Sequence, residues 1–100
     1  MPRSATAVSK QPHRALRDRT EIKRILEKAF RSEFPTDTVD VSDGYESNIH
    51  ILVVSRRFDK ISSEREKQDL LWGIIDKTDL TDAEKLLISL VLPVSPALLK

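Results

Sequence analysis

The sequence predicts a single α+β domain with the element order α-β-β-α-(short α)-β, in which the helices pack on one face of a three-stranded sheet. Three observations carry this prediction. Apolar residues recur at helical spacing in residues 18–34 and again in 63–75. Two β-forming stretches flank a turn-rich segment at 42–48, and a third β-forming run occupies 87–92. One hundred residues with 39% hydrophobic content suffice for one core and rarely for two.

The first helix is expected to begin after Asp18. The run Asp18-Arg19-Thr20-Glu21 fits a capping box, in which the first side chain and the Glu three positions later satisfy free amide groups. Phe34 ends this helix, because the residue before a proline is driven out of the α region. The apolar positions between these ends form one stripe of an amphipathic helix: Ile22, Ile25, Leu26, Ala29 and Phe30.

Residues 1–17 are interpreted as a flexible basic tail that precedes the domain at 18–100. The tail holds two prolines and scattered basic residues without apolar periodicity. Residues 1–32 carry nine Lys/Arg against three Asp/Glu, whereas 33–100 carry eight against thirteen. A basic segment of this kind is attracted to nucleic acid or to an acidic partner surface. The alternative is a tail whose charge only keeps the protein in solution.

Two strands are expected to pair as a hairpin. Val39 and Val41 alternate with polar residues in the stretch 36–45, which is typical of a half-exposed strand. The turn formers of 42–48 then lead into a β-forming run from Ile49 to Ser55. Because this second run is apolar on nearly both faces, it is expected to be the central strand, covered on one side by helices.

The second half of the chain is expected to hold a helix, a helical turn and a last strand. Ser63 and Glu66 fit a capping box, and apolar residues including Trp72 follow at helical spacing. If Trp72 is a core residue, its replacement by Ala should cost about 3–5 kcal/mol. Thr81 and Glu84 fit a third capping box, which predicts a short helix. The Ile and Val content of 87–92, just before Pro93, favours a strand.

Several classes of protein are not expected. The chain has no apolar run of the roughly 20 residues that cross a bilayer. Its first ten residues lack the apolar region of a secretory signal. The chain contains no cysteine, so disulfides and thiolate metal sites are excluded and the cytoplasm is the expected compartment.

Catalytic and cofactor motifs are not found. The two histidines are His13 in the tail and His50 in the second strand, and neither belongs to a metal-binding spacing. His50 is a weak candidate ligand and fits a sheet residue better. No serine sits in a G-x-S-x-G setting, and two glycines cannot build a phosphate-binding loop or the G-x-x-G of KH domains. We therefore expect a protein that is not an enzyme and that holds no cofactor.

Basic residues gather where the second strand meets the second helix. Phosphate contacts and base stacking at such a cluster would suit nucleic acid, and the same cations would suit an acidic protein partner. Acidic Asp59, Glu64 and Glu66 are interleaved with the cations, so a solvated surface is the alternative. Phe58 fits either an exposed stacking residue or the core. The candidate contact residues are Arg56, Arg57, Phe58, Lys60, Arg65 and Lys67.

Short passages along residues 20–98 match motifs of a known family in the same order. Val39-Asp40-Val41-Ser42-Asp43 looks like a first strand entering its turn, and Val53-Val54-Ser55-Arg56-Arg57-Phe58 looks like the V-V-S-x-x-F passage that ends a second strand. Ser62, Glu64 and Arg65 resemble the segment before an Arg-His helix start. Ile88-Ser89-Leu90 and Ser95-Pro96 resemble a final A-L-S-L strand and a closing T-P. With the element order, these passages resemble the BolA-like family, whose fold is a relative of the KH arrangement.

The sequence departs from that family at two informative positions. Asp59-Lys60 stands where the family places Gly, and Glu66 stands where it places its signature His. The family uses that His, with a His or Cys in the first hairpin loop, to share an iron–sulfur cluster with a monothiol glutaredoxin. This chain has neither ligand at those positions.

The resemblance therefore implies a non-enzymatic binding or regulatory protein without a cofactor, whose partner is a monothiol glutaredoxin, another protein or nucleic acid. Two alternatives stay open. One is a KH-like nucleic-acid-binding domain, and the other is a generic protein-interaction module.

Overall fold

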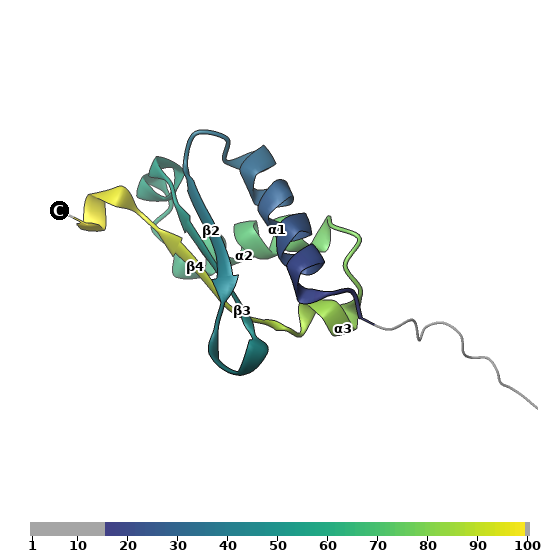
Figure 1. The fold of residues 1–100 in the computed structure, drawn as a ribbon. Helices are drawn as coiled ribbons and strands as arrows, with labels where there is room; N and C mark the ends of the chain where they lie inside the picture. The colour runs from purple at the N-terminus through teal and green to yellow at the C-terminus, as the bar shows by residue number, and fades with distance from the viewer. Residues whose placement is uncertain (1–15, 100) are drawn as a thin grey trace, which may run out of the picture.

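The computed structural model describes residues 16–99 and confirms the predicted order of elements (Figure 1). Short 3-10 helices follow each strand, at Tyr45–Ser47, Arg56–Lys60 and Pro96–Leu99. Within the described residues, no helix combines the length and the apolar character that a membrane crossing requires. The helices and strands are α1 (Arg19–Glu33), β2 (Thr38–Asp43), β3 (Ile49–Val54), α2 (Glu64–Asp76), α3 (Asp82–Lys85) and β4 (Ile88–Val94).

The three strands form one mixed sheet in the order β2-β3-β4. β2 and β3 are antiparallel neighbours joined by the hairpin, and β3 and β4 are parallel. The parallel pair requires a long crossover, which α2 and α3 supply. The predicted central position of β3 is confirmed.

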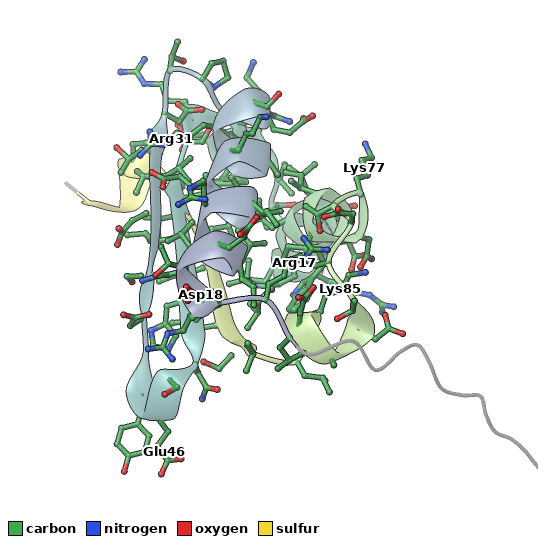
Figure 2. All side chains as sticks on the ribbon, turned by 45° about the vertical axis from the view of Figure 1, so that its right-hand side comes forward. Arg17, Asp18, Arg31, Glu46, Lys77 and Lys85 are labelled. Atoms are coloured by element: carbon green, nitrogen blue, oxygen red, sulfur yellow. The ribbon has the colours of Figure 1, made fainter. Side chains whose placement is uncertain are left out.

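All three α-helices lie on one side of the sheet, as Figure 2 shows with the sheet seen nearly edge-on. The core between the two layers is apolar. In β3, Ile49, Ile51 and Val53 are fully buried against the helices, while the residues between them are only half-buried. From α1, Ile22, Leu26 and Phe30 are buried, as the helical spacing predicted.

The three predicted capping boxes form to different degrees. Thr81 and Glu84 make the complete reciprocal box at the start of α3. Ser63 accepts a hydrogen bond from the Glu66 amide, and Asp18 accepts one from the Thr20 amide. Among the described residues, these two caps receive no return bond from the carboxylates of Glu21 and Glu66, three positions later.

Both outer strands have a backbone carbonyl group occupied by a helix side chain. Nη2 of Arg31, in α1, donates to the Val39 carbonyl of β2 at 3.1 Å. Nε2 of Gln68, in α2, donates to the Val91 carbonyl of β4 at 2.8 Å. β4 also continues through Pro93, which has no amide hydrogen and is tolerated because the strand has a neighbour on one side only.

The predicted tail at 1–17 lies almost wholly outside the described residues. Its last residue, Arg17, belongs to the folded domain. The Arg17 amide donates to Oε2 of Glu84 at 2.9 Å, and its guanidinium contacts Asp79 at 3.0 Å (Figure 2). Arg17, which was predicted to belong to the tail, is thus bonded to the folded domain.

Candidate partner-binding site

One face of the sheet is left uncovered by helices within the described part of the chain. The strand register places alternate residues of all three strands side by side on this face, because paired residues in neighbouring strands point the same way. The residues buried against the helices alternate with them along each strand. We call this surface the open face: Thr38, Asp40, Ser42, His50, Leu52, Val54, Leu90, Leu92 and Val94.

The open face has an apolar half and a polar half. Leu52 of β3 pairs with Leu92 of β4, and the neighbouring Leu90 pairs with His50. Leu90 and Leu92 each expose 43% of their surface, which is unusual for large aliphatic side chains placed next to one another. On the other side, β2 contributes polar residues, of which Asp40 carries the charge.

A cleft continues the open face past the end of β3. It has a volume of about 610 Å³, and Thr38 and Val54 of the open face line it together with Arg56. Its other charged lining residues are Glu33, Asp37 and Arg57. Arg56 is exposed, and its side chain makes no hydrogen bond or ion pair with any residue from 16 to 99. An uncommitted positive charge therefore stands at one end of the apolar surface.

The turn that carries Arg56 is held by three contacts. The Ser55 amide donates to the Val94 carbonyl at 3.1 Å, and Oγ of Ser55 accepts from the Arg57 amide at 3.1 Å. The hydroxyl of Ser95 donates to the carboxylate of Asp59. The position of Arg56 is thus fixed from β4 as well as from β3.

Arg57 differs from its neighbour because its side chain is used inside the domain. Its Nη1 donates to the Glu33 carbonyl at the end of α1 at 2.9 Å, and its guanidinium lies 4.3 Å from the centre of the Phe34 ring. Phe34 in turn contacts Phe58, with ring centres 5.7 Å apart. Arg57 therefore ties the end of α1 to the end of β3, and of the predicted contact residues it is one with a structural role.

Two further predicted contact residues are not accessible. Phe58 is 1% exposed and belongs to the core, so it offers no ring for base stacking. Lys67 is 6% exposed, and its Nζ contacts Oε2 of Glu64 at 3.1 Å. Of the two roles that the sequence left open for Phe58, the core is the one observed, with its ring against Phe34, and Lys67 lies on the buried side of α2.

The remaining predicted cations are exposed. Lys60 lines a second cleft of about 750 Å³, whose wall also includes Arg56, Ile61 and Leu70. Arg65 lies in the first turn of α2 and makes no ion pair with the described residues. The structure thus brings Arg56 and Lys60 to one cleft.

His50, the weak candidate ligand, lies half-buried on the open face. Its ring packs over Gly44, where an added Cβ would stand 2.2 Å from Nε2. No group of three or more His, Asp or Glu residues gathers in a metal-binding arrangement within residues 16–99. Glu66, at the position of the family's signature His, is exposed in the first turn of α2.

The hairpin end of the sheet is held to α1 by charge. Lys23 Nζ and Arg19 Nε each lie 3.1 Å from Oδ1 of Asp43, the last residue of β2. The hydrogen bond from Lys23 and the charges of both cations lower the pKa of Asp43 against the effect of burial. Asp43 and its two cations are therefore paired with one another, whereas the side chains of Arg56 and Asp40 have no ion-pair partner among the described residues.

Comparison of the chain with protein-family models, with curated proteins and with solved structures gives no match. The use of the open face must therefore be argued from its own geometry and charge.

Proposed function

We propose that this chain is a non-enzymatic, BolA-like binding protein whose open face receives an amphipathic helix from a protein partner. One observation carries the proposal: Leu90 and Leu92, each 43% exposed, lie beside half-buried Leu52 on a sheet face that no described helix covers. Contiguous apolar surface of this kind marks interaction sites in otherwise well-packed domains.

The dimensions of the open face match those of a helix. Three strands about 4.8 Å apart and roughly 20 Å long present about 300 Å² to a partner. A helix of about 14 residues is roughly 10 Å wide and 21 Å long, which matches the apolar half and extends over the polar half.

The charges around the open face specify the chemistry of that helix. Arg56 stands at the end where β3 and β4 finish, and its side chain forms no ion pair within the described residues. A positive charge there favours the C-terminal end of a docked helix or a carboxylate side chain. Asp40, in the polar half, favours a basic residue on the flank of the helix.

Nucleic acid is the competing ligand, and the site supports it less well. Arg56, Lys60 and Arg65 are exposed and uncommitted, which suits phosphate contacts. Phe58 is buried, however, so the cluster lacks an aromatic platform on which a base could stack. Asp59 lies among the same cations and weakens their field.

A monothiol glutaredoxin is one protein that the BolA-like resemblance suggests as the partner. The proposal extends to a cytoplasmic location, which the lack of cysteine supports.

The test follows backbone NMR signals of the full chain during three separate titrations. The probes are a 14-residue helical peptide with leucines at i, i+3, i+4 and i+7 and a C-terminal Glu, a single-stranded oligonucleotide, and a monothiol glutaredoxin carrying its cluster. We expect the peptide to shift signals of β3 and β4. Because each leucine contributes about 1.5–3 kcal/mol when buried, the double variant Leu90→Ser/Leu92→Ser should bind it more than tenfold more weakly.

Variants of single charges complete the design. Arg56→Glu should weaken the peptide, whereas Arg24→Glu, an exposed cation on α1, should leave its affinity unchanged. If only the oligonucleotide produces shifts, and these vanish with rising salt and in Arg56→Glu/Lys60→Glu, the protein-binding proposal fails in favour of nucleic acid.

A further inference from the structure

A second surface lies between the helices, apart from the open face. It is a groove of about 450 Å³ between α1 and α2. Ile25 and Ala29 of α1 and Ile74 of α2 line it with apolar surface. Its volume lies within the range of about 300–1,000 Å³ that is usual for ligand sites.

The cations along α1 are used in two different ways. Arg19 and Lys23 are paired with Asp43, and Arg31 is paired with Glu27 at 2.9 Å. Arg24 and Lys28 have no carboxylate partner within residues 16–99, and of these two Lys28 lines the groove. The α1 cations that form ion pairs thus contact β2 or another residue of α1, whereas Lys28, at the groove, forms no ion pair with the described residues.

The other side of the groove repeats this arrangement. Lys77, which follows the last residue of α2, also lines the groove and makes no ion pair with the described residues. Figure 2 shows Lys77 and Arg31 on opposite sides of α1. Glu33 is the one carboxylate among the lining residues and lies at the end of α1. The rim therefore carries a net positive charge around an apolar floor.

We propose that this groove binds a short apolar segment flanked by carboxylates, supplied by a partner protein. The apolar residues would cover Ile25, Ala29 and Ile74, and the carboxylates would face Lys28 and Lys77. Charge complementarity of this kind selects the partner and speeds its approach. The inference does not depend on the open face, so the domain would contact partners on two sides.

The chain's own N-terminal residues do not supply the carboxylates of the proposed ligand. Residues 1–15 contain three basic residues and no acidic one. Since like charges repel, the positive rim of the groove favours an acidic segment of another protein.

The test uses two synthetic peptides and the full chain. Both peptides have 12 residues with two central leucines, flanked on each side by Glu in the first and by Lys in the second. We expect the Glu peptide to shift the NMR signals of Ile25, Ala29, Ile74 and Lys77, with an affinity that falls as salt screens the charges. The Lys peptide should bind at least about tenfold more weakly.

Matched variants separate the groove from other surfaces. Lys28→Glu/Lys77→Glu should reduce the affinity of the Glu peptide at least about tenfold. Arg65→Glu makes the same change in charge as either of these substitutions alone, at the opposite end of α2 from Lys77, and should leave the affinity unchanged. Leu90→Ser/Leu92→Ser, on the open face, should also have no effect. Circular dichroism would confirm that each variant keeps the fold.

The following results would overturn the inference. Equal binding of the two peptides would show that charge does not select the ligand. Shifts confined to β3 and β4, or loss of binding in Leu90→Ser/Leu92→Ser, would place the peptide on the open face. Concentration-dependent self-association that competes with the Glu peptide would assign the groove to a second copy of the chain.

Discussion

The carboxylate of Glu84 is buried beneath Arg17, a residue 67 positions earlier in the chain. Oε2 accepts from the Arg17 amide at 2.9 Å and lies 3.5 Å from its Nε, while Oε1 accepts from the Thr81 amide at 2.9 Å. The same arginine reaches Asp79 at 3.0 Å. The start of α1 is thereby fixed to the connection between α2 and α3.

This arrangement predicts acid-sensitive stability. Burial by itself would raise the pKa of Glu84, but the amides of Thr81 and Arg17 and the charge of Arg17 outweigh it and lower the pKa below its ordinary value of 4.5. A lowered pKa in the folded state means that the stabilisation is complete above the unfolded value and disappears as the pH falls through the folded one. Urea unfolding of the wild type and of Glu84→Gln would measure it.

At pH 7 we expect Glu84→Gln to cost about 1–3 kcal/mol, since a buried, hydrogen-bonded charge is replaced by a neutral group. The difference between the two proteins should shrink below about pH 4.5. A difference that stays constant from pH 7 to pH 3 would show that the ionised form of Glu84 is not what stabilises the fold.

Adjacent arginines should respond differently to the same substitution. Arg57→Ala removes a hydrogen bond to the Glu33 carbonyl and the contact with the Phe34 ring, so we expect a loss of about 1 kcal/mol in the free energy of unfolding. Arg56→Ala removes no described intramolecular bond and should change that free energy by less than about 0.5 kcal/mol. Equal losses in urea unfolding would contradict the separation of structural and binding roles.

The second helix offers a comparison between neighbouring residues. Trp72 is partly buried and packs against the core, so the condition that it is a full core residue is not met, whereas Leu71 is completely buried. Leu71→Ala should cost about 3–5 kcal/mol. Trp72→Ala should cost less, about 1–3 kcal/mol, because part of its side chain is already exposed to water. Thermal and urea unfolding of both variants would show whether this order holds.

We predict that position 44 must be glycine because the His50 ring occupies the space of a Cβ there. A Cβ at position 44 would stand 2.2 Å from Nε2 and 2.5 Å from Cδ2 of the ring, so Gly44→Ala must displace the imidazole. We expect a cost of about 1–3 kcal/mol, typical of overpacking. In a double-mutant cycle with His50→Ala, most of that cost should disappear because the obstructing ring is gone. Additive effects would show that the turn, rather than the ring, excludes the methyl group.

The elements of the fold could be predicted from local sequence patterns. The stripe from Ile22 to Phe30, the alternation around Val39 and the apolar run after Ile49 each carry their own periodicity. Boundaries shifted where tertiary contacts decide them. β4 extends through Pro93 because only its inner side needs backbone hydrogen bonds, and the first strand is shortened to Thr38–Asp43.

The candidate site was less predictable, because burial depends on how elements pack. Phe58 sits between basic residues in the sequence, yet its ring is covered by Phe34, 24 positions earlier. The sequence did contain an indication of the open face. β3 was predicted to be apolar on both faces and to be covered by helices on one face only, which leaves apolar residues on the other face. The exposure of Leu90 and Leu92 depends on the register of β4, which includes an irregularity at Ile49/His50.

Helix side chains bond to backbone carbonyl groups on both edges of the sheet, and this limits how a partner can bind. With Arg31 bonded to Val39, Gln68 bonded to Val91 and Pro93 lacking an amide hydrogen, neither border of the sheet offers an uninterrupted ladder to an incoming strand. Recognition by β-augmentation, which relies on main-chain bonds common to all sequences, is therefore disfavoured. A partner must therefore be recognised through its side chains. The interrupted sheet edges also disfavour edge-to-edge pairing of strands from different copies, which is the step that leads to amyloid-like stacking.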